Sequence, residues 1–226
     1  MASRLASKLA ASSGKPVFYA NQWDNLSNRQ AHFESTGPEI WAQLGGKAPD
    51  AFSCAMGTGG TLAGVYRYAR STGSSTKICL TDPEGAAVLR SFTEGELRSV
   101  GSSISEGIGQ GRITGNMAAD DFRPDMFFEV PDAEMMPILH SLQRDDGIPV
   151  GGSAGINVAG AIRVAEEMGP GHTIVTILCD RADRYATKLY NPSFLKSRGL
   201  PIPPWLKQDV DCKRLLQDCC SAAMAP

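Results

Sequence analysis

A glycine-rich run, Gly57-Thr58-Gly59-Gly60-Thr61, constrains the fold of this chain more than any other feature of its sequence. It follows the apolar segment 51–55, which we predict as a strand, and precedes segment 62–70, which has helical spacing of apolar and basic residues. Glycines let the backbone come close to a ligand, and the free N–H groups of a first helical turn can bind an anion. The run therefore predicts a phosphate site, with further hydroxyl donors from Thr58 and Thr61.

Two familiar phosphate-binding motifs do not fit this run. The dinucleotide fingerprint, counted from Gly57, requires a third glycine where Leu62 stands. A Walker loop requires a lysine after its last glycine, and the sequence has no lysine between Lys47 and Lys77. The run therefore suits a single phosphate group better than a nucleotide pyrophosphate. Taken by itself, it is equally consistent with a turn that has only a structural role.

Strand-like and helix-like segments alternate along the chain. We predict strands at 51–55, 77–82, 126–130 and 173–179, helices at 1–13, 28–33, 38–44, 62–70, 132–143 and 154–168, and an irregular stretch at 85–115. This order predicts an α/β fold with a mostly parallel sheet and helices on both faces. The β-branched segment 173–179 is predicted as a buried central strand, and Asp132 and Ser153 as helix caps.

The predicted strand ends point to one ligand cleft. In an open parallel sheet, ligands bind at the carboxyl ends of the strands. Gly57, Ser153 and Asp180 each fall just past such an end. We therefore expect these three residues to line the same cleft.

Composition narrows the classes of partner. The 226 residues carry a net charge of −2, which gives no electrostatic reason to expect nucleic acid or an anionic membrane. No apolar run approaches the roughly 20 residues that cross a bilayer. The three histidines and six cysteines lack metal-site spacing, so no metal is expected. The cysteines favour a reducing compartment, the cytoplasm, and the basic, acid-free segment 1–23 makes the mitochondrion the second choice.

Several further motifs accompany the glycine run. They are Phe18-Tyr19-Ala20-Asn21-Gln22-Trp23-Asp24-Asn25, Ser35-Thr36-Gly37-Pro38-Glu39-Ile40-Trp41, Glu106-Gly107-Ile108-Gly109, Gly151-Gly152-Ser153-Ala154-Gly155-Ile156-Asn157, and Ile174-Val175-Thr176-Ile177-Leu178-Cys179-Asp180 followed by Arg184-Tyr185. In this order and spacing the chain resembles the cysteine synthases (O-acetylserine sulfhydrylases), transferases of the β-family of pyridoxal-phosphate enzymes. The resemblance covers about residues 5–206 and implies the C-terminal part of the tryptophan-synthase-β-like fold.

The resemblance implies pyridoxal 5′-phosphate as the cofactor, with its phosphate at residues 57–61. It places Gln22, Trp23 and Gly107 on the substrate side, with ordinary core packing as the alternative for Trp23. Asp180 falls where the family has a side chain opposite the pyridine nitrogen, and its most familiar members have serine there. A carboxylate would favour a protonated ring through charge pairing. An aspartate at a strand end can also simply cap a turn.

The family pattern also includes a part that we do not find in the sequence. Family members carry a lysine that forms the Schiff base and a loop that binds the substrate carboxylate, both in a block that should precede Phe18. None of the eight lysines has that context, so the Schiff-base lysine is expected to be absent and we identify no catalytic residue. We expect 1–16 to be the remnant helix of the missing N-terminal block, 17–206 the pyridoxal-phosphate-binding α/β domain, and 207–226 a partly disordered tail.

These features predict a cysteine synthase-like protein, which would make L-cysteine from O-acetylserine and sulfide by β-replacement, with little activity because the lysine is absent. Serine deamination and cystathionine formation share the scaffold and stay open. The alternative is a non-catalytic binding or regulatory protein that forms a homodimer or associates with a full-length homologue. Apolar surface around Trp23, Ile108 and Ile156 is then expected to be exposed without the missing block. A truncated gene model or spliced isoform of an active parent is the third reading.

Overall fold

The computed structural model describes residues 1–119 and 121–207, so the predicted tail lies outside the described residues except for Lys207. A parallel sheet of four strands forms its centre, in the order β3-β2-β1-β4. The strands are β1 (Ala51–Cys54), β2 (Lys77–Pro83), β3 (Met126–Val130) and β4 (Ile174–Thr176). β1 pairs with β2 and β4, and β2 pairs with β3. The predicted α/β class with a parallel sheet is confirmed.

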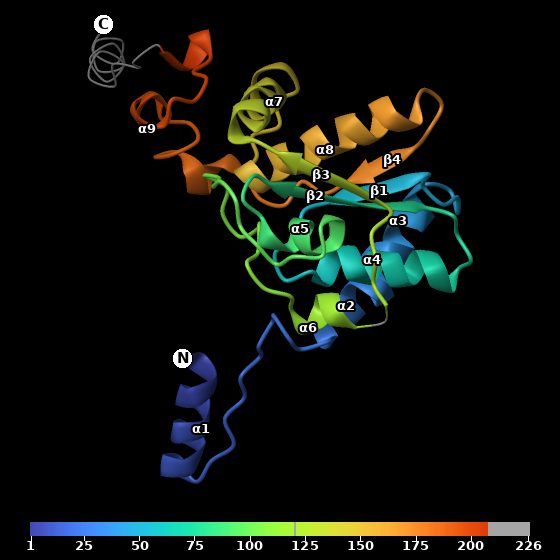
Figure 1. Ribbon diagram of the computed structural model, residues 1–226, viewed down its shortest axis with the longest axis vertical. Coiled ribbons are helices and arrows are strands. Elements are labelled where there is room, and N and C mark those ends of the chain that lie inside the picture. The colour runs from blue at the N-terminus through green and yellow to red at the C-terminus, as the bar shows by residue number, and fades with distance from the viewer. Residues whose placement is uncertain (120, 208–226) are drawn as a thin grey trace, which may run out of the picture.

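Helices cover both faces of this sheet (Figure 1). On one face lie α4 (Gly60–Ser71), α2 (Ser27–Ala31), the π-helical turn η1 (His32–Thr36) and α3 (Gly37–Gln43). On the other face lie α7 (Asp132–Asp145) and α8 (Gly152–Met168). The remaining helical segments are α1 (Ala2–Ser13), α5 (Ala87–Thr93), α6 (Gly115–Ala118), η2 (Ala182–Tyr185), α9 (Pro192–Ser197) and η3 (Pro204–Lys207).

Alternation along the strands separates two buried layers. Successive residues of a strand point to opposite faces of its sheet. Phe52 and Leu80 belong to a buried cluster with Leu62 of α4. Their neighbours Ser53 and Thr81 point the other way, toward α8, and their hydroxyl oxygens are 2.8 Å apart in a buried hydrogen bond. The two central strands, β1 and β2, are therefore covered on both sides, as their apolar sequences predict.

β4 differs from its prediction. The sequence predicts a buried central strand at 173–179, but β4 has three residues and lies at the edge of the sheet. Ile174, Val175 and Thr176 are only half-buried. The prediction of a central strand is wrong because β-branched residues favour a strand at the edge as well as at the centre. The sequence pattern carries no information on how many neighbours that strand has.

The stretch 85–115 also differs, since it contains a helix where the sequence predicts irregular structure. α5 starts two residues after Gly85, whose φ is 89°, and it buries Val88 and Leu89. The surrounding glycines mask this helix in the sequence, because they suggest loop structure throughout the stretch.

Both predicted helix caps are wrong. α8 begins at Gly152 with Gly151 as its N-cap, so Ser153 lies inside the helix. Asp132 is the first residue of α7, after Pro131. Its carboxylate accepts hydrogen bonds from Ser103 Oγ at 2.5 Å and from the N–H of Ile104 at 2.8 Å. Asp132 therefore anchors the 100–105 loop through these two hydrogen bonds.

α1 stands apart from the rest of the structure (Figure 1) and contains no buried residue. Residues 14–20, which follow it, are also exposed, Phe18 at 85%. Among the described residues, no helix is both long and apolar enough to span a bilayer.

The apolar residues predicted to be exposed behave in two ways. Trp23 and Ile108 are half-buried. Ile156 is fully buried, so the expectation is wrong for this residue. It lies in a cluster with Met135 and Leu139 of α7, because α8 turns this side chain toward its neighbouring helix.

Candidate functional site

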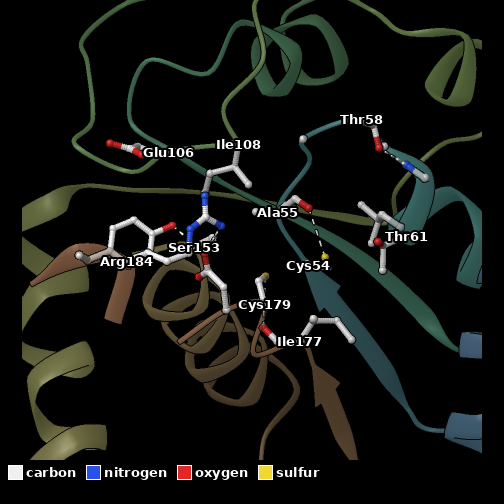
Figure 2. Close-up of a pocket in the computed structure, with 17 residues that line it drawn as sticks. Cys54, Ala55, Thr58, Thr61, Glu106, Ile108, Ser153, Ile177, Cys179 and Arg184 are labelled. Atoms are coloured by element: carbon white, nitrogen blue, oxygen red, sulfur yellow. Dashed lines mark hydrogen bonds and ion pairs between the residues drawn. The ribbon is translucent and has the colours of Figure 1, made fainter. Parts of the chain in front are cut away.

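A cavity of about 530 Å³ opens at the carboxyl ends of β1 and β4, between the first turns of α4 and α8 (Figure 2). All residues of the glycine run, Gly57, Thr58, Gly59, Gly60 and Thr61, line it. Ser153 and Asp180 line it too, so the structure brings together the residues that the strand ends predicted. Thr58 and Thr61 lie on one side of the cavity, and Ser153 and Arg184 on the other (Figure 2).

The glycine loop requires its glycines. Gly59 is the N-cap of α4 and has a φ of 82°, a conformation that other residues adopt at a cost. A Cβ atom at Gly59 would lie 2.5 Å from Met117 Cγ, and one at Gly57 would lie 2.4 Å from the carbonyl oxygen of Gly107. The loop is therefore packed closely on its outer side. The first residues of α4, Gly60, Thr61 and Leu62, line the cavity, and the N–H groups of a first helical turn have no acceptor within their own helix.

Thr58 is held by residues that sequence reasoning missed. Asn28 Nδ2 donates to Thr58 Oγ1 at 2.9 Å, and the N–H of Gly60 donates to the same oxygen at 3.3 Å. Thr114 Oγ1 donates to the carbonyl oxygen of Thr58 at 2.7 Å. Because Thr58 Oγ1 accepts two hydrogen bonds, its own hydrogen is available to donate to a ligand.

Thr61 lies beside a histidine. Its Oγ1 is 3.2 Å from His32 Nε2, and His32 Nδ1 is 2.8 Å from Thr36 Oγ1. Burial lowers the pKa of His32, which favours the neutral ring. His32 thus links Thr61 to Thr36 and orients the Thr61 hydroxyl.

Asp180 lies across the cavity from the glycine loop, and hydrogen bonds from neighbouring residues hold its carboxylate and its backbone carbonyl. Tyr185 Oη donates to Asp180 Oδ2 at 2.7 Å, and Arg184 Nη1 lies 3.3 Å from the same oxygen. The N–H of Gly151 donates to the Asp180 carbonyl at 2.9 Å. Asp180 Oδ1 is buried and has no hydrogen-bond partner among the described residues. A buried acceptor without a partner is unusual and is consistent with a ligand donor.

The Asp180 carboxylate affects the pKa of Tyr185 and requires a glycine at position 151. Burial, followed by the hydrogen bond to Asp180, raises the pKa of Tyr185 to about 12, so its hydroxyl stays a donor at neutral pH. Gly151 leaves room for the carboxylate, because a Cβ atom there would lie 2.2 Å from Asp180 Oδ1. The aspartate therefore has its own packing and hydrogen bonds, beyond those of a simple turn cap.

The residues predicted for the substrate side are only partly brought together. Gly107 lines the cavity. Gln22 is exposed and Trp23 is half-buried, and the cavity lining includes neither. The carbonyl oxygens of both accept hydrogen bonds from Asn116 Nδ2, at 3.0 and 2.9 Å. They lie behind the glycine loop, where Asn28 also donates to Gln22.

No lysine lines the cavity in the described part of the chain. Lys188 forms an ion pair with Glu106 at the rim. The same part of the chain contains no cluster of His, Cys, Asp and Glu residues that could hold a metal ion.

A family profile described as "Pyridoxal-phosphate dependent enzyme" matches residues 1–180. The chain belongs to this family. Cysteine synthase 1 of Emericella nidulans is 47% identical over 198 residues, which are 85% of this chain and 53% of that protein. Cysteine synthase 2 of Schizosaccharomyces pombe is 40% identical over 205 residues, 86% of this chain and 51% of that protein. This chain therefore spans about half the length of these curated relatives.

A solved structure agrees with this assignment. The crystal structure of O-ureido-L-serine synthase matches with a TM-score of 0.71 and 30% identity, over 83% of this chain and 57% of that one. The predicted fold family is confirmed, and so is the resemblance to cysteine synthases. Pyridoxal phosphate is the cofactor of the family, as the sequence predicts.

The residues present fit this cofactor. The close-packed glycine loop at the start of α4 suits a phosphate, and the free hydrogen of Thr58 adds a donor. The orphaned Asp180 Oδ1 is an acceptor on the opposite side of the cavity. A molecule with a phosphate at one end and an N–H at the other matches this pair of sites.

Proposed function

We propose that this chain supplies the phosphate-binding half of a cysteine synthase-like site, at which L-cysteine is formed from O-acetylserine and sulfide by β-replacement. The observation that carries the proposal is the glycine loop and Asp180 facing one cavity from opposite sides. The named relatives support a small amino acid as substrate. Their names also favour cysteine formation over serine deamination or cystathionine formation.

Pyridoxal phosphate, when bound, supplies an electron sink for the substrate. The task of this chain is to hold and orient it. The first-turn N–H groups of α4 and the Thr58 hydroxyl would bind the phosphate. Asp180 would accept the hydrogen of a protonated ring nitrogen at Oδ1, while Tyr185 holds its Oδ2. Gly107 would lie on the substrate side, with Gln22 and Trp23 supporting the loop from behind.

Because no lysine lines the cavity within the described residues, the 226 residues alone are proposed to have little or no turnover. The resemblance assigns the proton transfer at the substrate α-carbon to the Schiff-base lysine, and no lysine lines this cavity in the described part of the chain. We place the protein in the cytoplasm, with the mitochondrion as the second choice.

Titration of the purified chain with pyridoxal 5′-phosphate tests this function. Equilibrium dialysis should show reversible binding with which inorganic phosphate competes. Borohydride reduction followed by peptide mass spectrometry should find no modified lysine, and O-acetylserine with sulfide should give no cysteine above background. Absence of competition by phosphate would contradict the assigned phosphate site. A trapped lysine together with cysteine formation would contradict the proposed lack of turnover.

Two structural features favour a second function, a non-catalytic binding or regulatory protein. β4 presents a half-buried sheet edge, and Val17, Phe18 and Tyr19 are exposed apolar residues. Such surfaces suit association with a second copy or a full-length homologue. Native mass spectrometry, alone and with a full-length cysteine synthase of the same organism, tests this. A strict monomer in both measurements counts against it.

A further inference from the structure

β1 and β4 part at the point where the cavity begins. Their last ladder pair is Ser53 with Thr176, and Thr176 Oγ1 donates to the Ser53 carbonyl at 2.7 Å. Beyond this pair, β1 leads into the glycine loop and β4 leads to Asp180. The backbone groups just past the ladder are without strand partners, so other groups must satisfy them.

One side chain from α8, Asn157, fills this gap. It is fully buried, and its Oδ1 accepts the N–H of Ala55 at 2.8 Å. Its Nδ2 donates to the carbonyl oxygen of Ile177 at 2.8 Å and lies 3.5 Å from Cys179 Sγ. Only this orientation of the amide is consistent with an N–H on one side and a carbonyl on the other.

The two bonds reach both halves of the candidate site. Ala55 stands two residues before Gly57, and Ile177 stands three residues before Asp180. A carboxamide carries a donor and an acceptor in one rigid plane, so it can bridge the two diverging strands. An aliphatic side chain of the same size would leave the Ala55 N–H without a partner and the Ile177 carbonyl oxygen with only the Cys179 thiol, 3.9 Å away.

We propose that Asn157 is a positioning residue, whose single amide sets the glycine loop and Asp180 relative to each other. This inference rests on the proposed function, because it concerns the spacing of the two groups that would hold the cofactor. Inorganic phosphate would contact only the loop, whereas pyridoxal 5′-phosphate would span both groups. Asn157 should therefore matter more for the second ligand than for the first.

Three variants of the full chain test this. Asn157→Leu removes both hydrogen bonds at similar volume. Asn157→Asp keeps the acceptor for Ala55 but loses the donor to Ile177, except at low pH, where a protonated carboxyl can donate again. The control is Val164→Ala, on the same helix and fully buried, which loosens the packing of α8 without touching either strand end.

Dissociation constants for both ligands and amide exchange by NMR are the readouts. Asn157→Leu should weaken binding of pyridoxal 5′-phosphate by about tenfold or more, and binding of inorganic phosphate by less. It should also speed hydrogen exchange of the Ala55 amide. Asn157→Asp should shift the amides of Cys179 and Asp180 at neutral pH, with recovery in acid, while Ala55 stays protected. Val164→Ala should change neither the balance between the two dissociation constants nor these amides.

The outcomes separate the two proposals. If the native chain does not bind pyridoxal 5′-phosphate, the proposed function fails, but the amide pattern still decides the role of Asn157. If Asn157→Asp and Asn157→Leu behave like Val164→Ala in both readouts, the positioning role is wrong. Should Asn157→Leu fail to fold, the acid recovery expected of Asn157→Asp decides, and its absence overturns the role.

Discussion

At the scale of single residues, Gly59 carries the strictest demand of the candidate site. Its φ of 82° disfavours any side chain, and a Cβ atom added there would lie only 2.5 Å from Met117 Cγ. Gly59→Ala should cost about 1–2 kcal/mol from the backbone alone. The displaced loop should also weaken binding of pyridoxal 5′-phosphate by about tenfold or more. Urea unfolding and equilibrium dialysis measure the two effects.

Gly73 provides the matched control. It also has a positive φ, 67°, but a Cβ atom there would meet nothing within 4 Å. Gly73→Ala should therefore show the backbone cost without the change in binding. Equal effects of the two variants on binding would mean that close packing of the loop is irrelevant to the ligand.

Asp82 is a fully buried acid directly behind the glycine loop. Its Oδ1 accepts the N–H of Met56 at 2.9 Å, and its Oδ2 has no partner among the described residues. Burial, opposed by the hydrogen bond from the Met56 N–H and assisted by the negative charge of Glu129, raises the pKa of Asp82 to about 7. The Cys54 thiol also lies nearby, with its own pKa raised by burial. The folded protein therefore holds a proton here that the unfolded chain releases.

This difference makes stability depend on pH. Because the folded pKa lies above the unfolded one, the contribution is complete below the unfolded value near 3.8 and is lost as pH rises through about 7. Between these limits the slope should be about 1.4 kcal/mol per pH unit. Asp82→Asn keeps the acceptor for Met56 and should remove this slope in urea unfolding from pH 5 to 8. A native chain whose stability is flat over that range would contradict the buried-acid assignment.

The sequence could reveal those residues of the candidate site that belong to a pattern of neighbouring residues. The glycine run lies between a strand and a helix, and Asp180 ends a strand, so both could be placed at the cavity in advance. Asn28 and Asn157 could not, because Asn28 donates to Thr58, 30 positions away, and Asn157 accepts from Ala55, 102 positions away. A buried amide that bridges two strands has no signature in a single sequence, since its meaning comes from the partners that folding brings to it.

At the scale of elements, α8 can lie on β2 only because Gly160 has no side chain. A Cβ atom there would lie 2.1 Å from Thr81 Oγ1. In an open helix, Gly→Ala stabilises by about 0.5–1 kcal/mol, whereas overpacking costs about 1–3 kcal/mol. Gly160→Ala should therefore lower the free energy of unfolding. Adding Thr81→Ala should recover part of the loss, and strictly additive effects in this double-mutant cycle would show that the two residues do not meet.

Helices and strands could be predicted where their pattern of apolar residues runs without interruption along the sequence. Alternating strands and helices gave the parallel sheet, because each strand is a short apolar run and each helix has an apolar stripe. β4 was assigned a central place because its apolar β-branched residues do not distinguish an edge from a centre. α5 was missed because the glycines around it suggest loops, although Val88 and Leu89 are buried. The place of β4 and the presence of α5 both depend on which residues lie nearby in space, and the sequence alone does not show this.

At the scale of the whole molecule, the described fold presents a candidate ligand cavity and a sheet with two edge strands, β3 and β4. The cavity has the glycine loop and a carboxylate but no lysine among its lining residues. β4 has a strand neighbour on one side only. Both features agree with a chain that spans about half the length of its relatives. This chain is therefore suited to test ligand binding by a cavity whose described lining has no lysine.

α1 is the part of the molecule with the least connection to the rest. It has no buried residue, and the segment that follows it is exposed through residue 20. Deletion of residues 1–16 should therefore leave the thermal midpoint within about 2 °C, since a loss of 1 kcal/mol would shift it by about 2–4 °C. Leu195→Ala, which opens a fully buried position, is the comparison and should lower the midpoint clearly. If the deletion lowers the midpoint as much as Leu195→Ala does, α1 packs against the domain or a second copy in solution, and native mass spectrometry of both forms tells which.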